Sequence, residues 1–384
     1  MGVPVAMVEL SDIVGQPEAV TILTRATTGD RRHHAFLFAG PEGVGRRTTA
    51  TAFAKALLCT GSGTAPGASL FGEPAPAPSG ACGACPDCRM FDAGSHPDFH
   101  MVYKELARYH DDEKVRDSVM QELGIAVIRK FLLSAASLKP ARGKGKVFVV
   151  READLLSDEA QNAMLKTLEE PPGGVTIILI CRRGEELLAT TRSRCSLVRF
   201  GPLPREFVRE KLLEAGLEER ECVFWSAFTD GSVGRALRMA SAGLYEIKRD
   251  VLTRLAGNDA ELGDHLTKTA EGLSDWAVAQ AKEDAGAVLS KNLALRQGAG
   301  MLLELVAGAF ADALTLATGA DRPLAHPDQP DVAEALAKRF GLEQLAEVIE
   351  GLSRLEQILW RNVNAKILWD NVAISCASAA PLGL

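Results

Sequence analysis

The distribution of apolar residues divides the chain into two parts. In the first part, short apolar runs alternate with stretches of helical periodicity, and the runs cover residues 35–39, 99–103, 146–150, 175–180 and 196–200. Strands that alternate with helices predict a parallel sheet with helices on both faces. After Pro202 no further strand-like run occurs, and Ala, Leu, Glu and Lys predominate, which predicts a helical second part.

Local signals place the helices of the first part. Helices are expected over residues 17–28, 46–58, 124–138 and 158–170. Pro17 suits a first helical position, Ser157 can cap the last of these helices, and Pro171-Pro172 ends it. Residues 60–80 are rich in Gly, Pro, Ala and Ser without periodicity, so we expect a loop there.

The length of 384 residues allows two or three domains with sizeable cores. The composition changes at Gly201-Pro202 and again near residues 241–243. We therefore expect an α/β domain over 1–201, a small helical domain over 202–243 and a larger helical bundle over 244–384.

Composition and charge describe a soluble globular protein. Hydrophobic residues make up 47% of the chain and charged residues 24%. A net charge of −7 argues against a protein that coats nucleic acid non-specifically. The chain has no run of 18 apolar residues, and residues 1–10 lack the pattern of a secretory signal. We expect a cytoplasmic protein without a membrane partner.

Four of the eight cysteines have the spacing of a metal site. Cys82, Cys85 and Cys88 are separated by two residues each, and Cys59 lies at the end of the helix expected over 46–58. Four thiolates in this pattern favour a structural Zn²⁺ site, with an iron–sulfur cluster as the alternative. His96 is a possible extra ligand, although a histidine in a Ser-His-Pro-Asp loop is more often a turn residue.

A glycine-rich stretch between the first strand and its helix has the frame of a phosphate-binding loop. Gly40, Gly43 and Gly45 allow a turn whose backbone N–H groups point at an anion. The full pattern requires Lys and then Ser or Thr, but this chain has Arg46 and Arg47. The loop therefore lacks both the lysine and the hydroxyl that binds Mg²⁺.

These motifs together resemble a known family, the clamp-loader subunits of bacterial DNA polymerase III, which belong to the AAA+ class. The resemblance covers about residues 8–240 and rests on segments 12–16, 34–45, the four-cysteine insert, 161–172 and Ser193-Arg194-Cys195. It implies an α/β AAA+ domain with a zinc insert over 59–88, a helical lid and an all-α collar. The last third is similar to the collar only in being helical.

Within the family, the chain is most similar to the delta-prime type. Members that hydrolyse ATP place a Mg²⁺-binding aspartate after the third strand, where this chain has Arg151. A guanidinium has no acceptor and cannot bind a cation. The sensor positions are also altered, to Cys181 and Gly234, although Arg235 could partly substitute. The resemblance implies weak or absent ATP binding and no efficient hydrolysis.

The resemblance gives Arg194 a role in trans. In this family the arginine of the Ser-Arg-Cys motif reaches the γ-phosphate that an adjacent ATPase subunit binds, and such arginine fingers accelerate phosphoryl transfer. The plain alternative is a surface salt bridge. The implied partners are gamma/tau ATPase subunits and a delta subunit in a heteropentamer, and through it the sliding clamp and primer–template DNA.

Two other functions remain as alternatives. An ATP-hydrolysing gamma/tau-type subunit would have Lys at 46, Thr at 47 and Asp at 151, and a stand-alone zinc-stabilised binding module would not need the Ser-Arg-Cys motif. The basic loop 139–146 is either a solvated turn or a DNA contact. Glu169 and Glu170 are interpreted as interface or solvated charges.

Overall fold

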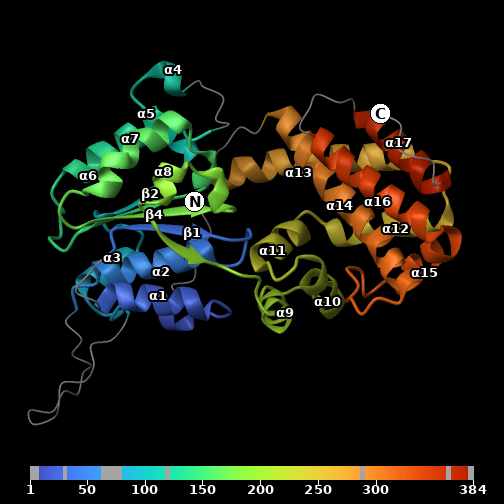
Figure 1. Cartoon of the computed structure of the whole chain (residues 1–384), viewed down its shortest axis with the longest axis horizontal. Helices are drawn as coiled ribbons and strands as arrows, with labels where there is room; N and C mark the ends of the chain where they lie inside the picture. The colour runs from blue at the N-terminus through green and yellow to red at the C-terminus, as the bar shows by residue number, and fades with distance from the viewer. Residues whose placement is uncertain are drawn as a thin grey trace, which may run out of the picture. The chain divides into compact units, whose positions relative to one another are not determined.

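The computed structural model describes residues 8–28, 33–61, 80–116, 122–285, 290–359 and 365–378. The chain divides into two compact units, Val3–Leu203 and Pro204–Leu384 (Figure 1). Each unit has its own core, and each is described by itself.

The first unit is built on one five-stranded sheet with the order β2-β3-β4-β1-β5. All neighbouring strands pair in parallel. The strands are β1 (Ala35–Ala39), β2 (Phe99–Val102), β3 (Lys146–Val150), β4 (Val175–Cys181) and β5 (Ser196–Arg199). Because Ala39 pairs with Cys181, the carboxyl ends of the central strands β1 and β4 lie side by side.

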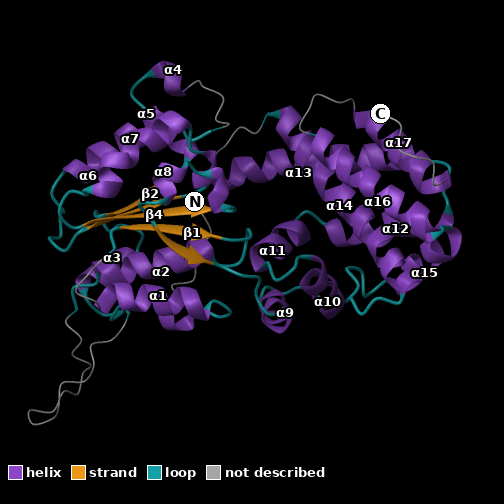
Figure 2. Ribbon diagram, viewed as in Figure 1, coloured by secondary structure: helices purple, strands orange, loops and turns teal. Residues whose placement is uncertain are grey.

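Helices cover both faces of the sheet (Figure 2). The helices α1, α2 and α3 lie on one face, and α5, α6, α7 and α8 lie on the other. The helical elements of this unit are η1 (Leu10–Asp12), α1 (Pro17–Thr28), α2 (Arg46–Leu58), α3 (Pro86–Asp92), η2 (Lys104–Tyr109), α4 (Glu113–Arg116), α5 (Ile125–Ile128), η3 (Arg129–Ser134), α6 (Ala135–Ser137), η4 (Ala153–Leu155), α7 (Asp158–Glu169), η5 (Gly184–Glu186) and α8 (Ala189–Arg192).

The fold predicted for the first part is confirmed. All five expected strands form, within one or two residues at their ends, and their apolar side chains make the core together with the covering helices. Ser157 caps α7 by accepting a hydrogen bond from the backbone N–H of Ala160. Of the expected loop 60–80, residues 62–79 lie outside the described residues.

One predicted helix has an irregular centre. The stretch expected over 124–138 is helical, but Arg129–Ser134 forms a π-helical segment between α5 and α6. The hydroxyl of Ser134 donates to the carbonyl oxygen of Arg129, five residues earlier, at 2.8 Å. The wider turn keeps Ile128, Leu132 and Ala136 in the core, at a spacing of four residues.

Among the described residues of the second unit, every regular element is a helix and no strand forms, as the sequence predicts. Its helices are α9 (Arg205–Glu214), α10 (Glu219–Phe228), α11 (Val233–Ser241), α12 (Leu244–Gly257), α13 (Leu262–Ala285), α14 (Lys291–Thr318), α15 (Pro330–Arg339), α16 (Leu342–Ile358) and α17 (Ala365–Ser378). The division of this unit into a lid over 202–243 and a collar over 244–384 stays a prediction.

Helix α14 is the one described helix that is long and apolar enough to cross a membrane by length and composition. It contacts α13, α15 and α16. Half of its most apolar window is buried by such packing, which is the character of a core helix.

Candidate functional site

The glycine loop between β1 and α2 has the backbone of a phosphate-binding loop. Gly43 and Gly45 have φ values of 76° and 95°, a region that favours glycine. At Gly40, a Cβ atom would lie 2.3 Å from the carbonyl oxygen of Phe200, so only glycine fits there. The loop frame predicted from the sequence is therefore present.

Gln16 holds this loop against the end of β5. Its buried side-chain amide donates to the carbonyl oxygens of Val44, at 3.3 Å, and Gly201, at 2.8 Å. Its Oε1 accepts from the backbone N–H of Gly201 at 3.0 Å. Gln16 therefore supports the loop from the end of the segment 12–16.

Arg46 is directed into the protein. Its side chain is 8% exposed, and Nη1 donates to the backbone carbonyl oxygen of Cys181 at the end of β4. Burial lowers the pKa of Arg46. The cation at the lysine position of the loop thus bonds to the neighbouring strand.

A second arginine, Arg151, follows the carboxyl end of β3. The guanidinium of Arg151 lies over the ring of Tyr103, 5.6 Å from its centroid. Glu152 has a φ of 50°, and its carboxylate lies 4.0 Å from Nζ of Lys104. The carboxylate of Glu152 therefore lies near Lys104, and the residue before Glu152 is Arg151.

Cys181, at one of the positions that the family resemblance assigns to sensors, and Arg235, next to the other, both have partners within their own units. The thiol of Cys181 is buried, and this burial raises its pKa to about 12, so it stays neutral at physiological pH. In the second unit, Arg235 forms an ion pair with Glu304 of α14, and its guanidinium lies 5.9 Å from the ring centroid of Phe228. Arg235 is thus bound within its own unit.

Arg194 lies at the surface after α8 and is 31% exposed in its side chain. Its Nε donates to Oε1 of Glu169 at 2.6 Å, and Nη2 donates to the same oxygen. Its Nη1 donates to the carbonyl oxygen of Thr190 at 2.8 Å. Glu169 is therefore an ion-pair partner, and the surface salt bridge weighed as the alternative for Arg194 is present in the free chain.

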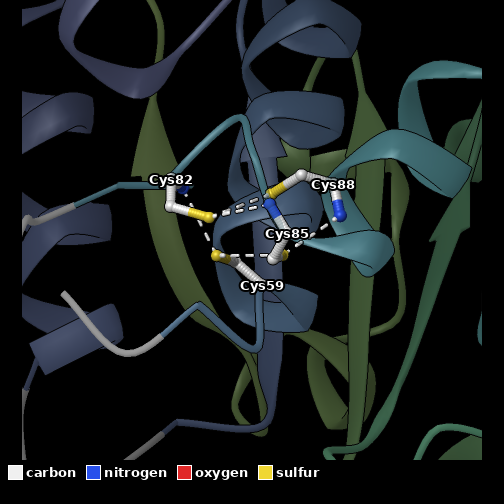
Figure 3. Close-up of side chains that lie close together, drawn as sticks. All are labelled: Cys59, Cys82, Cys85 and Cys88. Atoms are coloured by element: carbon white, nitrogen blue, oxygen red, sulfur yellow. Dashed lines mark hydrogen bonds between the residues drawn. The ribbon is translucent and has the colours of Figure 1, made fainter. Parts of the chain in front are cut away.

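The four predicted metal ligands come together (Figure 3). The sulfur atoms of Cys59, Cys82, Cys85 and Cys88 all lie within 4.8 Å of one another. Two of the pairs, Cys59–Cys85 and Cys82–Cys88, are 3.9 Å apart. A tetrahedral zinc site with Zn–S bonds of about 2.3 Å has S–S edges of about 3.8 Å. The cluster therefore fits a tetrahedral ion such as zinc.

Backbone N–H groups point at these sulfur atoms. The amides of Cys82, Cys85 and Cys88 donate to Cys59, Cys82 and Cys85, at 3.3, 3.4 and 3.4 Å respectively. Burial alone would raise the pKa of Cys85, but hydrogen bonds from Cys88 and from the Thr60 and Gly61 backbone outweigh it and lower that pKa to about 5. A thiolate is therefore favoured in the cluster before any ion binds.

A layer of charged residues surrounds the cysteines. The buried carboxylate of Asp87 accepts from Nε of Arg142 at 2.8 Å and from the hydroxyl of Thr60. Nε2 of His96 lies 3.6 Å from the same carboxylate, so His96 belongs to this layer and not to the four-sulfur group. Lys144 donates to the backbone carbonyl of Cys59.

The basic loop 139–146 is thereby bound to the metal insert. Besides the contacts of Arg142 and Lys144, the backbone N–H groups of Ala141 and Arg142 each donate to the carboxylate of Asp98 at 2.8 Å. Lys146 lies in β3, is buried, and donates to the carbonyl oxygen of Ala135. Lys139, Arg142 and Lys144 are nevertheless exposed, so the loop is a solvent-exposed turn that is tied to the insert by these contacts.

The sequence interpretation missed Asp87 and Asp98. Asp87 lies between Cys85 and Cys88, so the spacing of the cysteines was a signal that could have drawn attention to it. Asp98 ends the Ser-His-Pro-Asp turn, whose polar composition was a weaker signal.

Comparison with known proteins places these features in one family. The family described as "DNA polymerase III, delta subunit" matches residues 15–204, and the one described as "DNA polymerase III, delta subunit, C terminal" matches residues 271–376. The two matches together span more than half of the chain and fall on both units.

Individual relatives agree with this family. The chain is 32% identical over 225 residues to a DNA polymerase III subunit delta' from Pseudomonas aeruginosa, which covers 57% of this chain and 59% of that protein. It is also 32% identical over 241 residues to a DNA polymerase III subunit tau from Salmonella typhimurium, covering 61% of this chain and 33% of the relative. The chain thus spans about a third of the tau relative and about three fifths of the delta' relative.

One solved structure matches most of the chain at low similarity. It is a DNA polymerase III gamma subunit-related protein from Thermotoga maritima, with a TM-score of 0.46 and 15% identity. The match covers 94% of this chain and 99% of that chain.

Proposed function

Because this chain belongs to the DNA polymerase III delta-subunit family, we propose that it is a delta-prime-type stator of a bacterial sliding-clamp loader. In this proposal the chain does not hydrolyse ATP. It assembles in the cytoplasm with gamma/tau ATPase subunits and a delta subunit in a heteropentamer, which places the sliding clamp on primer–template DNA.

The observation that best supports a non-catalytic role is the hydrogen bond from Arg46 to the carbonyl oxygen of Cys181. Phosphoryl transfer depends on a lysine and Mg²⁺ placed against the β and γ oxygens of ATP. Here the corresponding cation is used by the protein itself, and Arg47 and Arg151 stand where Mg²⁺ ligands are needed. The same residues argue against the gamma/tau-type alternative, although a tau subunit is among the relatives.

Two groups have assigned roles in this proposal. Cys59, Cys82, Cys85 and Cys88 hold a structural Zn²⁺, which fastens the insert to the end of α2 and takes no part in chemistry. Arg194 acts in trans, as an arginine finger toward ATP bound by a neighbouring ATPase subunit. Its position at the surface, with a partly exposed side chain, supports this role.

The role of Arg194 is tested in the reconstituted complex. The R194A variant should assemble normally, and the rate at the one ATP site that it serves should fall by about 10³-fold or more. This loss lowers the DNA-stimulated ATPase rate of the complex, and the activity that remains comes from the ATP sites that Arg194 does not serve. The R192A variant is a matched control, because Arg192 is an exposed arginine two residues earlier. Unchanged ATPase activity of R194A would remove the finger assignment.

A further inference from the structure

We propose that Glu169 is a positioning residue that holds the guanidinium of Arg194 in the orientation in which it meets the neighbouring nucleotide. This inference rests on the proposed function of Arg194. It starts from the contact between the carboxylate of Glu169 and two nitrogens of the guanidinium.

The hydrogen bonds use one edge of the guanidinium and leave another available. Nε and Nη2 both donate to Oε1 of Glu169. The Nη2 hydrogen that takes part is the one on the same side as the Nε hydrogen. Nη1 donates to the carbonyl oxygen of Thr190 at 2.8 Å and to the hydroxyl of Ser193 at 3.4 Å. A guanidinium has five N–H donors in a rigid plane, so the second Nη2 hydrogen points away from Glu169 and has no partner among these contacts. This donor is the one offered to a phosphate oxygen.

Helix α7, which carries Glu169, contacts the chain at both ends of α8. Oε1 of the buried Gln161, in α7, accepts from the backbone N–H of Leu188, the residue that precedes α8, at 2.9 Å. Eight residues further along α7, Glu169 binds Arg194, which lies two residues after α8 ends. Because buried side chains of α7 share one core cluster with strands β3 and β4, the orientation of Arg194 is fixed to the core through two contacts from one helix.

Glu169 and Glu170 differ in this respect although they are adjacent acidic residues. Both are exposed, and Glu169 contacts Arg194. In the part of the chain that the structure describes, no hydrogen bond or ion pair joins Glu170 to Arg194. Glu170 therefore provides a matched control that removes the same charge one residue away.

A held side chain loses less conformational freedom when it binds. An arginine that is free in solution must be ordered in the complex, and this ordering lowers the rate at the site. Glu169 orders the guanidinium in advance, so its removal should weaken the finger without removing it. ATP is bound by the neighbouring subunit, so the KM for ATP should not change.

The test uses the complete reconstituted complex and compares E169Q with E170Q. The Arg194-dependent rate is defined as the DNA-stimulated ATPase rate of the wild-type complex minus that of the R194A complex. In E169Q this rate should fall about three- to tenfold, the range expected for ordering one long side chain. The E170Q complex should keep the wild-type rate, and all variants should assemble equally.

A double variant separates positioning from a general structural effect. If Glu169 acts through Arg194, the R194A/E169Q complex has the same rate as R194A alone. An equal rate for E169Q and wild type, a loss that persists in the R194A background, or a higher rate in E169Q would overturn the inference. A higher rate in E169Q would mean that the ion pair with Glu169 keeps Arg194 away from the neighbouring nucleotide. If R194A itself has the wild-type rate, the proposed function fails and the inference fails with it.

Discussion

Arg46 occupies the position at which a phosphate-binding loop has lysine, and its side chain spans from the start of α2 to the end of β4. An arginine presents several donors on a planar group, whereas lysine is a compact charge on a flexible chain. The guanidinium therefore reaches the carbonyl oxygen of Cys181 and is buried there. Arg46 thus joins the start of α2 to the end of β4, next to a loop that keeps its glycines.

The R46A variant should unfold at a lower temperature than the wild type. It leaves the buried carbonyl of Cys181 without its donor, which costs about 1–3 kcal/mol. The R47A variant is the control, because Arg47 is exposed and surface changes are usually within about 0.5 kcal/mol. Denaturant unfolding measures both variants. The ATPase rate of the reconstituted complex should be unchanged in R46A, and a loss of that rate at normal assembly would mean that Arg46 binds nucleotide.

The residue types of the candidate sites could be predicted from the sequence, but their partners could not. The spacing of Cys82, Cys85 and Cys88 predicts a shared metal, because two-residue gaps let the sulfur atoms point at one centre. The contact between Glu169 and Arg194 joins residues 25 positions apart through the packing of two helices. Such a contact depends on tertiary structure and has no local pattern.

At the scale of elements, the basic loop 139–146 has partners that its charge pattern does not reveal. Lysines and arginines in a loop before a strand suggest solvent or phosphate as their partners. In the structure, Arg142 and Lys144 contact the cysteine insert, which lies more than 50 residues earlier in the sequence. The carboxylate of Asp87 compensates Arg142, and a zinc centre with four thiolates would add further negative charge nearby. The contacts of Arg142 and Lys144 with the insert thus account for part of the basic character of the loop, and a DNA contact of the loop stays a prediction.

Removing the metal should loosen this loop. The insert holds Arg142 and Lys144 only while its own conformation is fixed, and chelation removes the bonds that fix it. Hydrogen exchange of a peptide covering residues 139–146 should therefore become faster after chelation, and a peptide covering β4 should exchange as before. The peptide from β4 is the control because that strand lies inside the sheet. Equal exchange of the loop with and without metal would contradict the coupling.

The helix expected over 124–138 shows a different limit of sequence reasoning. Its apolar spacing gives the helix and its buried face correctly. It does not give the π-helical segment Arg129–Ser134, because one extra residue in a turn changes the local hydrogen bonds but leaves an apolar face that still reads as helical. This helix was therefore predictable from periodicity, and its irregular centre was not.

At the scale of the whole molecule, polar contacts join the two segments expected as lid and collar. Arg235 of α11 pairs with Glu304 of α14, and Phe224 of α10 stacks on His326, which lies between α14 and α15. These contacts explain why residues 204–384 form one compact unit. The sequence showed a change of composition near residues 241–243, but composition alone does not report how two helical segments pack.

A buried ion pair lies at the centre of these contacts. Lys248 is 0% exposed, and its Nζ lies 2.6 Å from Oδ2 of Asp328 and 4.4 Å from the ring centroid of Phe224. The hydroxyl of Tyr245 donates to the same carboxylate at 3.0 Å. Burial lowers the pKa of Lys248, and Asp328 opposes this effect. The carboxylate is therefore what keeps a buried ammonium group charged.

The D328A variant should destabilise the second unit in a way that depends on pH. Loss of the carboxylate leaves a buried, unpaired cation, which costs about 3–5 kcal/mol at neutral pH. Without Asp328 the pKa of Lys248 falls further in the folded state, whereas in the unfolded state it stays near ~10.4. At pH values between the folded and the unfolded pKa of Lys248, the unfolded state binds more protons than the folded state. The free energy of unfolding of D328A should therefore rise as the pH increases toward the unfolded pKa.

The double variant D328A/K248M separates the charge from the packing. Methionine fills much of the volume of lysine without a charge, so the double variant should recover much of the lost stability and lose the dependence on pH. Denaturant unfolding at several pH values between 7 and about 10 measures both effects. A D328A variant whose stability does not change over this range would mean that Lys248 reaches solvent or finds another partner. In that case the ion pair would not be what joins α12 to the loop before α15.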